Sequence, residues 1–184
     1  MPEEEWGNPA ALGLAGFGLT TTALSFYNMG VIGASGYTLS YGFMYGGLAQ
    51  VIAGIIDFRR DNTFGGTAFT SYGLFWIGLA LLNLLEHYKI FTSSPGELAV
   101  WMALWGIFTL YLTVGAIALK ARAVSVVLGL LTILFFLLSA AFGLNNQTLL
   151  KIAGGWGVAT GLSAVYTSAA IVINTSYGKT VLPE

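Results

Sequence analysis

Uncharged polar side chains are the groups in this sequence that could bind a ligand inside its long apolar segments. They include Thr20, Thr21 and Gln50. A threonine hydroxyl often hydrogen-bonds back to its own helix and is then structural, whereas the amide of Gln50 needs several partners. No Asp, Glu, Lys, Arg or His lies in the middle of an apolar segment, which excludes a voltage sensor, an intramembrane carboxylate relay and an arginine clamp. The sequence therefore predicts a lightly polar path.

The residue types needed for catalysis or for metal binding are scarce. The chain has no cysteine and a single histidine, His87, so disulfides, thiolate metal sites and a cysteine nucleophile are excluded. Without a nucleophile–base pair or a metal constellation, we expect no enzyme, no metal and no cofactor. The net charge of −1 and the lack of a charge run indicate that nucleic acid is not a partner.

The composition indicates an all-α integral membrane protein. Hydrophobic residues occupy 56% of the 184 positions and charged residues 8%, whereas soluble domains carry about 25% charged residues. A spanning helix needs about 20 mostly apolar residues, and six runs satisfy this: 10–34, 37–56, 67–85, 98–119, 124–144 and 149–173. We therefore predict a single transmembrane domain over residues 1–184 with six transmembrane helices joined by short loops.

The positive charges predict the orientation in the membrane, because short cytoplasmic loops are enriched in Lys and Arg. With both termini in the cytoplasm, the cytoplasmic side carries Arg59, Arg60, Lys120, Arg122 and Lys179. Lys89 and Lys151 then lie outside. We predict a multi-pass protein of the cell membrane with both termini inside.

Small residues form one face of two predicted helices. The last helix carries Gly154, Gly157, Gly161, Ala164 and Ser168, and the second carries Gly42, Gly46, Ala49 and Ala53. Helices in lipid pack closely through such faces. Because these faces exceed what a single six-helix bundle needs, we expect some of them to lie between protomers of a homo-oligomer.

The first helix opens with an unusual stretch, "NPAALGLAGFGLTTT". Asn8 and Pro9 suit a helix start, since the first amide groups have no partner within the helix. Further along, Phe17, Thr20, Thr21 and Leu24 follow at i, i+3, i+4 and i+7 and share one face. This face combines bulk with hydroxyl groups, as the wall of a narrow polar path would.

A short sequence pattern that occurs twice in the chain indicates a hydrophobic constriction. Aromatic–Gly–Leu occurs at Phe17 in the first helix and at Tyr72 in the third, and Leu131 lies at a comparable depth in the fifth. A ring of these three side chains would form a gate of the kind that closes by dewetting. Chance similarity between glycine-rich helices is the alternative interpretation.

Several motifs resemble the acetate uptake transporters, also called succinate–acetate permeases, over nearly the whole chain. They are "NPAALGLAGFGLTT" (8–21), "GGLAQVIAG" (46–54), "NTFGGTAFTSYGLFW" (62–76), "LWGIFTL" (104–110) and "YGKTVLP" (177–183). This chain has Ala11 where the family usually has a second proline.

The resemblance implies six helices around a pore in each protomer, a homohexamer, and passage of acetate and, in some members, succinate. It assigns Phe17, Tyr72 and Leu131 to the pore constriction and Ala164 to a position that affects substrate choice. Moving a carboxylate into hydrocarbon is costly unless polar groups replace its water. We expect Asn8, Thr20, Thr21 and Gln50 to supply those contacts. Without a buried carboxylate or histidine, any proton is expected to travel with the substrate.

Two alternatives remain open at this point. One is a channel for small neutral solutes, such as undissociated acids or ammonia. The other is a membrane protein that senses carboxylates without transporting them, although the short loops and tails of this chain offer no evident signalling element.

Overall fold

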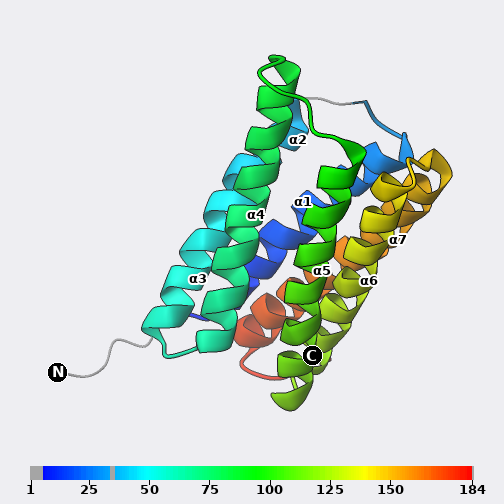
Figure 1. Cartoon of the computed structure of the whole chain (residues 1–184). Helices are drawn as coiled ribbons and strands as arrows, with labels where there is room; N and C mark the ends of the chain where they lie inside the picture. Colours follow the sequence, from blue (N-terminus) through cyan, green and yellow to red (C-terminus); the bar gives the residue numbers. More distant parts are fainter. Residues whose placement is uncertain (1–5, 34–35, 184) are drawn as a thin grey trace.

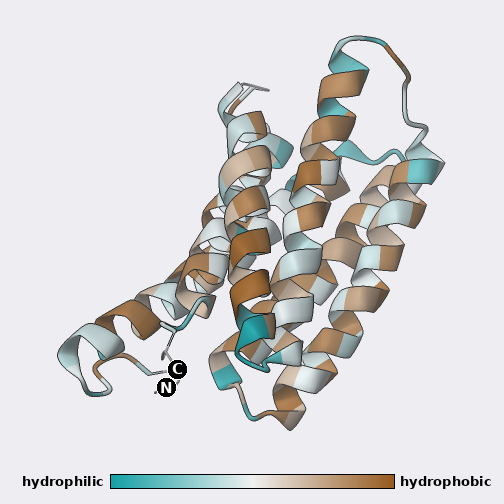
Figure 2. Ribbon diagram, turned by 90° about the vertical axis from the view of Figure 1, so that its left-hand side faces the viewer, coloured by the Kyte–Doolittle hydropathy of each residue, from teal (hydrophilic) through white to brown (hydrophobic). Residues whose placement is uncertain are grey.

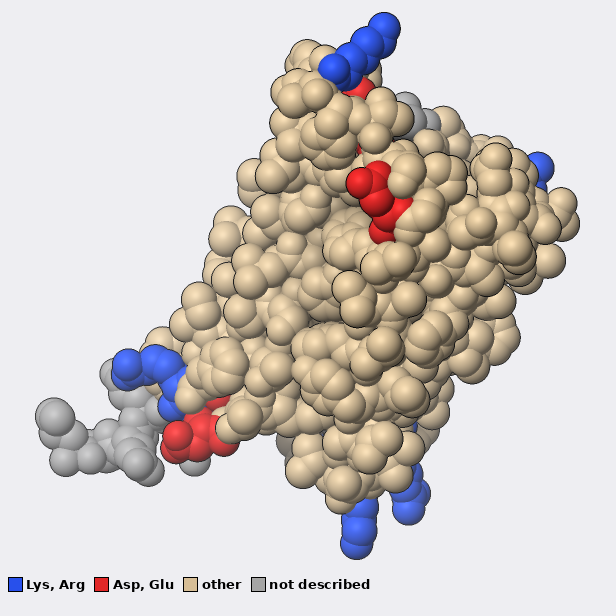
Figure 3. Space-filling view, viewed as in Figure 1, with Lys and Arg blue, Asp and Glu red and all other residues tan. Residues whose placement is uncertain are grey.

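The computed structural model of the chain describes residues 6–33 and 36–183. It confirms the predicted fold class: the described residues form six helices long and apolar enough to cross a membrane. Apolar residues line these helices along their length, and hydrophilic residues gather near their ends (Figure 2). Lys and Arg side chains lie at the two ends of the molecule, while the middle of the face in Figure 3 shows none.

The six spans comprise the following elements. α1 is Ala10–Met29; the second span contains α2 (Gly36–Ser40), η1 (Tyr41–Ala49) and α3 (Gln50–Arg59); α4 is Thr63–His87; α5 is Pro95–Ala118; α6 is Arg122–Gly143; and α7 is Gln147–Tyr177. Figure 1 shows the bundle, in which α1 packs on α7, α3 on α4 and α5 on α6.

Local sequence signals define most helix ends. The side chains of Asn62 and Asn146 accept hydrogen bonds from the amides of Gly65 and Leu149, both at 3.0 Å, and so cap α4 and α7. Ser94 and Glu97 form a capping box at the start of α5. These caps place the starts of the third, fourth and last helices two to four residues earlier than the apolar runs predict, because capping residues are polar and lie outside an apolar run.

The first two spans differ most from the prediction. α1 ends at Met29, followed by Gly30 in the left-handed region at φ 77°, which is a common helix end. The predicted end at Ala34 lies outside the described residues. The second span continues to Arg59 and contains a π-helical segment, η1. Apolar periodicity cannot reveal such a segment, and π-helical turns often mark functional sites.

The small-residue faces are used within the protomer, which corrects the expectation that some of them lie between protomers. A Cβ atom at Gly18 would lie 2.6 Å from the carbonyl oxygen of Gly161, so α1 and α7 approach closely. Gly46 packs in the same way against the side chain of Thr20. Close packing of backbones in lipid requires such residues. These faces are therefore already covered by helices of the same chain.

Candidate functional site

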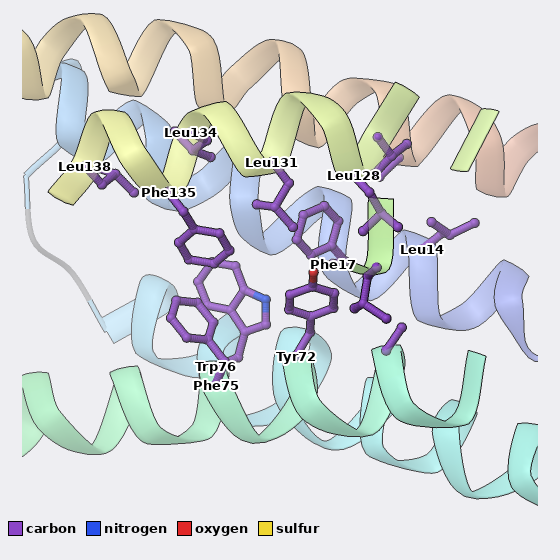
Figure 4. Packing of buried hydrophobic residues seen from close by; sticks show 14 of the residues in the cluster. Leu14, Phe17, Tyr72, Phe75, Trp76, Leu128, Leu131, Leu134, Phe135 and Leu138 are labelled. Atoms are coloured by element: carbon purple, nitrogen blue, oxygen red, sulfur yellow. The ribbon is translucent and has the colours of Figure 1, made fainter. Parts of the chain in front are cut away.

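Three large side chains from α1, α4 and α6 meet in the middle of the bundle. Phe17, Tyr72 and Leu131 point toward one another (Figure 4) and are 5%, 4% and 3% exposed. The ring centroids of Phe17 and Tyr72 lie 5.9 Å apart. The structure thus brings together the three residues that the resemblance assigned to a constriction, and we call them the neck.

A cavity lies on each side of the neck. The near cavity, of about 320 Å³, lies on the side where α1 begins and α7 ends, and the exposed residues Asn8, Asn62 and Leu119 line it. The far cavity, of about 30 Å³, is lined by Thr21, Leu24, Ser25 and Trp76 among others. All three neck residues line both cavities. Since a water needs roughly 10–15 Å³, the far cavity holds only a few small groups.

A further cavity continues beyond the far cavity. It measures about 420 Å³, shares Leu24 with the far cavity, and is also lined by Tyr27, Asn83 and His87. The single histidine of the chain therefore borders this outer space, away from the neck. The neck therefore lies where the wide near cavity meets the small far cavity, and the outer cavity borders the far cavity at Leu24.

The hydroxyl of Tyr72 is occupied by a neighbour rather than free for a ligand. It donates a hydrogen bond to the Thr109 Oγ1 at 2.9 Å, and Thr109 in turn donates to the carbonyl of Trp105 at 2.7 Å. The ring of Tyr72 also packs against Trp105 and Phe108. Thr109 thus fixes the position of the Tyr72 ring. No sequence motif indicates this role, because the two residues are 37 positions apart.

Polar atoms without a hydrogen-bond partner lie along the same route. Within the described residues, the Thr21 Oγ1, the Gln50 Oε1 and the Trp76 Nε1 have none. Gln50 lines the near cavity, and Thr21 and Trp76 line the far cavity. Buried polar groups without partners are rare, and beside a cavity they are free to bind a solute. Trp76, whose N–H is a donor only, was not among the predicted site residues.

Two of the predicted substrate contacts lie elsewhere. Thr20 is 1% exposed and packs against Gly46 of η1. It therefore lies beside, and not on, the face of α1 that borders the cavities. Ala164 is fully buried in the core of the bundle. Neither residue lines the near or the far cavity. Asn8 does line the near cavity, and its Oδ1 accepts a hydrogen bond from the Ala10 amide at 3.0 Å.

A buried carboxylate was missed by the sequence analysis. Asp57 belongs to the last turn of α3, is 1% exposed, and lines the near cavity. The apolar run ends at Ile56, so the sequence placed Asp57 in a loop. Its separation of seven residues from Gln50, which puts both on one helix face, is the signal that could have found it.

Comparison with known proteins adds to this geometry. The profile of the GPR1/FUN34/yaaH family matches residues 1–184. The chain is 40% identical to the succinate-acetate/proton symporter SatP of Escherichia coli K12, with 100% of this chain and 97% of that protein covered. It is 35% identical to ammonia transport outward protein 2 of Saccharomyces cerevisiae, over 92% of this chain and 62% of the yeast protein.

A solved structure has the same fold. The structure of the bacterial acetate channel SatP matches with a TM-score of 0.93 at 40% identity, and the match covers 97% of this chain and 99% of that chain.

Proposed function

The chain belongs to the GPR1/FUN34/yaaH family, and we propose that it transports acetate and related short-chain carboxylates, including succinate, through a pore in each protomer. Relatives named for succinate, acetate and proton transport, together with the solved acetate channel, support this function. The observation that carries it is the neck of Phe17, Tyr72 and Leu131, which lines both the near and the far cavity.

The route offers a carboxylate a few weak contacts. The amide of Gln50 faces the near cavity, while the Thr21 hydroxyl and the Trp76 N–H face the far cavity. Because an anion loses much free energy when it leaves water unpaired, the Thr21 hydroxyl and the Trp76 N–H, which have no partner among the described residues, lower the barrier on the far side of the neck. Neutral donors bind weakly enough for the solute to leave again, which throughput requires. These residues are suited to transporting the solute without converting it chemically.

Thr20 and Ala164 act indirectly in this proposal. Thr20 packs at the contact between α1 and η1, and Ala164 at the centre of the bundle. Both therefore position the helices that carry the neck. A change in side-chain size at either position would shift the helices that line the route, although the new side chain would not contact the solute.

The assembly and the orientation are also part of the proposal. The family resemblance supports a homohexamer in the cell membrane. The positive charges of Arg59, Arg60, Lys120 and Arg122 lie on the side of the near cavity, where α3 and α4 join and where α5 and α6 join. Under the positive-inside rule, the near cavity opens to the cytoplasm and both termini lie there.

Passage of small neutral solutes is the second candidate function. The neck supports it, because Phe17 and Leu131 are apolar and the hydroxyl of Tyr72 is bound to Thr109. The yeast relative named for outward ammonia transport also supports it. Flux of labelled acetate compared with methylamine distinguishes the two candidates.

The test is uptake of labelled acetate into proteoliposomes at two pH values, with and without a membrane potential. We expect saturable uptake that unlabelled succinate inhibits, whereas liposomes without protein take up only the undissociated acid, by a process that neither saturates nor responds to succinate. The control is Leu131→Trp, which fills the neck and should abolish the saturable part. Equal uptake by this variant in correctly assembled form would contradict a route through the neck.

A further inference from the structure

The near cavity contains one charged side chain among the described residues that line it, Asp57. Asn62 donates a hydrogen bond from its Nδ2 to the Oδ1 of Asp57 at 3.0 Å. The second carboxyl oxygen, Oδ2, is buried and has no hydrogen-bond partner within the described part of the chain. A buried carboxylate oxygen without a partner is unfavourable and calls for a functional explanation.

The residues around Asp57 hold its carboxyl group in one orientation. Asn62 holds the carboxyl through its amide nitrogen, while its amide oxygen accepts from the Gly65 amide at 3.0 Å. A Cβ atom at Gly65 would collide with the Oδ2 of Asp57. Only glycine at this position leaves the carboxyl in place. The same cap that begins α4 therefore orients the carboxyl of α3.

Few ionisable groups lie near Asp57 on the neighbouring elements. Arg60, which follows the end of α3, is the positive charge that interacts electrostatically with Asp57. The described sequences of α1 and η1, both packed against α3, carry no charged residue, and their titratable groups are tyrosines. On α4 the group at this cavity is Tyr72, since Glu86 and His87 lie at the opposite end of that helix.

The charge state of Asp57 controls what the near cavity can hold. When ionised, its carboxylate repels a second carboxylate in the same cavity. When protonated at Oδ2, it becomes a hydrogen-bond donor, which an anionic solute requires. Binding of the anion and binding of the proton therefore favour each other.

We propose that Asp57 is the proton-binding residue that couples proton movement to carboxylate movement. This inference rests on the proposed transport function and assigns the residue within it. In the outward direction, the protonated Oδ2 donates to a carboxylate oxygen of the solute, and the proton then moves to that oxygen. A neutral acid enters the neck, an ionised Asp57 remains, and water at the cavity mouth returns a proton to it. Uptake is the reverse sequence.

The neck explains why such a transfer is useful. Phe17 and Leu131 offer no donor, and the hydroxyl of Tyr72 donates to Thr109. An anion in an apolar constriction has lost its water without replacement, whereas a neutral acid loses far less. A carboxyl group in the cavity that leads to the neck supplies the neutralising proton where it is needed.

The experiment compares the wild-type chain, Asp57→Asn, Asp57→Glu and the matched control Asp61→Asn in proteoliposomes. Asp61 is exposed and has φ 56°, a conformation that Asn adopts readily. Labelled acetate uptake is measured at about pH 6 and about pH 8, where nearly all acetate is the anion. A potassium gradient with valinomycin sets the membrane potential, and hexamer-sized particles are verified beforehand by size-exclusion chromatography.

We expect uptake by wild type, Asp57→Glu and Asp61→Asn to fall about tenfold per pH unit and to be insensitive to potential. Asp57→Asn should be slower, should change less than about twofold over the same pH range, and should respond to potential because the anion then crosses alone. Assembled Asp57→Asn without any uptake, beside an active Asp57→Glu, also supports a titratable group.

Two results overturn the proposal. One is an assembled Asp57→Asn protein with the pH slope and the potential-independence of the wild type. The other is loss of uptake in both Asp57 variants, which would mean that Asp57 only shapes the cavity. Absence of saturable uptake in the wild type and in Asp61→Asn would instead refute the proposed transport function itself.

Discussion

Replacing Leu131 by alanine is the most direct test of the neck. Leu131 lies on α6 opposite the rings of Phe17 and Tyr72 (Figure 4), and it lines both the near and the far cavity. The substitution removes three carbon atoms from the level where the two cavities meet. We expect this level to widen and to admit water, because Leu131 is the one described residue of α6 that lines both cavities.

The effect on stability and on transport can be estimated separately. Truncation of a buried leucine to alanine costs about 2–5 kcal/mol, and a site bordered by cavities should lie near the lower limit, since it loses fewer packed contacts. A few carbon atoms of a hydrophobic wall discriminate between substrates by about 1–3 kcal/mol. We therefore expect the uptake of lactate or succinate relative to acetate to rise by about tenfold or more.

The assay is competition between labelled lactate and labelled acetate in proteoliposomes that contain verified assemblies. The control is Leu134→Ala, one turn further along α6, which lines the far cavity only and should leave the substrate ratio within about twofold of the wild type. A correctly assembled Leu131→Ala protein with the wild-type ratio would refute the assignment of substrate selection to this level.

Three further outcomes follow from the site. Tyr72→Phe should keep acetate flux within about twofold and cost about 0.5–1.5 kcal/mol. Thr109→Val should cost about 1–3 kcal/mol, because it leaves the buried Tyr72 hydroxyl without its partner; a double variant that is less stable in thermal unfolding than Thr109→Val alone would contradict this. Gln50→Leu should lower acetate flux without loss of assembly, whereas the isosteric Thr20→Val should leave flux unchanged. Equal effects of the two variants in the uptake assay would show that acetate flux does not depend on whether a residue lines the near cavity. Ala164→Phe overpacks a fully buried site and should lower the stability by about 1–3 kcal/mol or more, which is measured as dissociation of the assembly in detergent. A stable variant with a narrowed substrate range would contradict this prediction.

The residues of the neck show how far resemblance and periodicity reach. Phe17, Tyr72 and Leu131 were predicted from their motifs and depths, and the structure brings them together. Of the four residues that the helical pattern places on one face of α1, Phe17, Thr21 and Leu24 line the far cavity, whereas Thr20 packs against Gly46. Residues at i+3 and i+4 both count as one face in a helical pattern, and only the position of the neighbouring helices decides which of them borders a cavity.

The sequence by itself determined the membrane-spanning class, the six spans and the side on which most positive charges lie, because the thickness and the polarity of the bilayer impose these features on any chain. Helix packing decided the rest. It turned the small-residue faces inward, gave Tyr72 a partner on α5, formed the π-helical segment in the second span, and buried Asp57 beside the near cavity. These features depend on contacts between residues far apart in the chain, and a pattern of apolar residues along one helix carries no information about them.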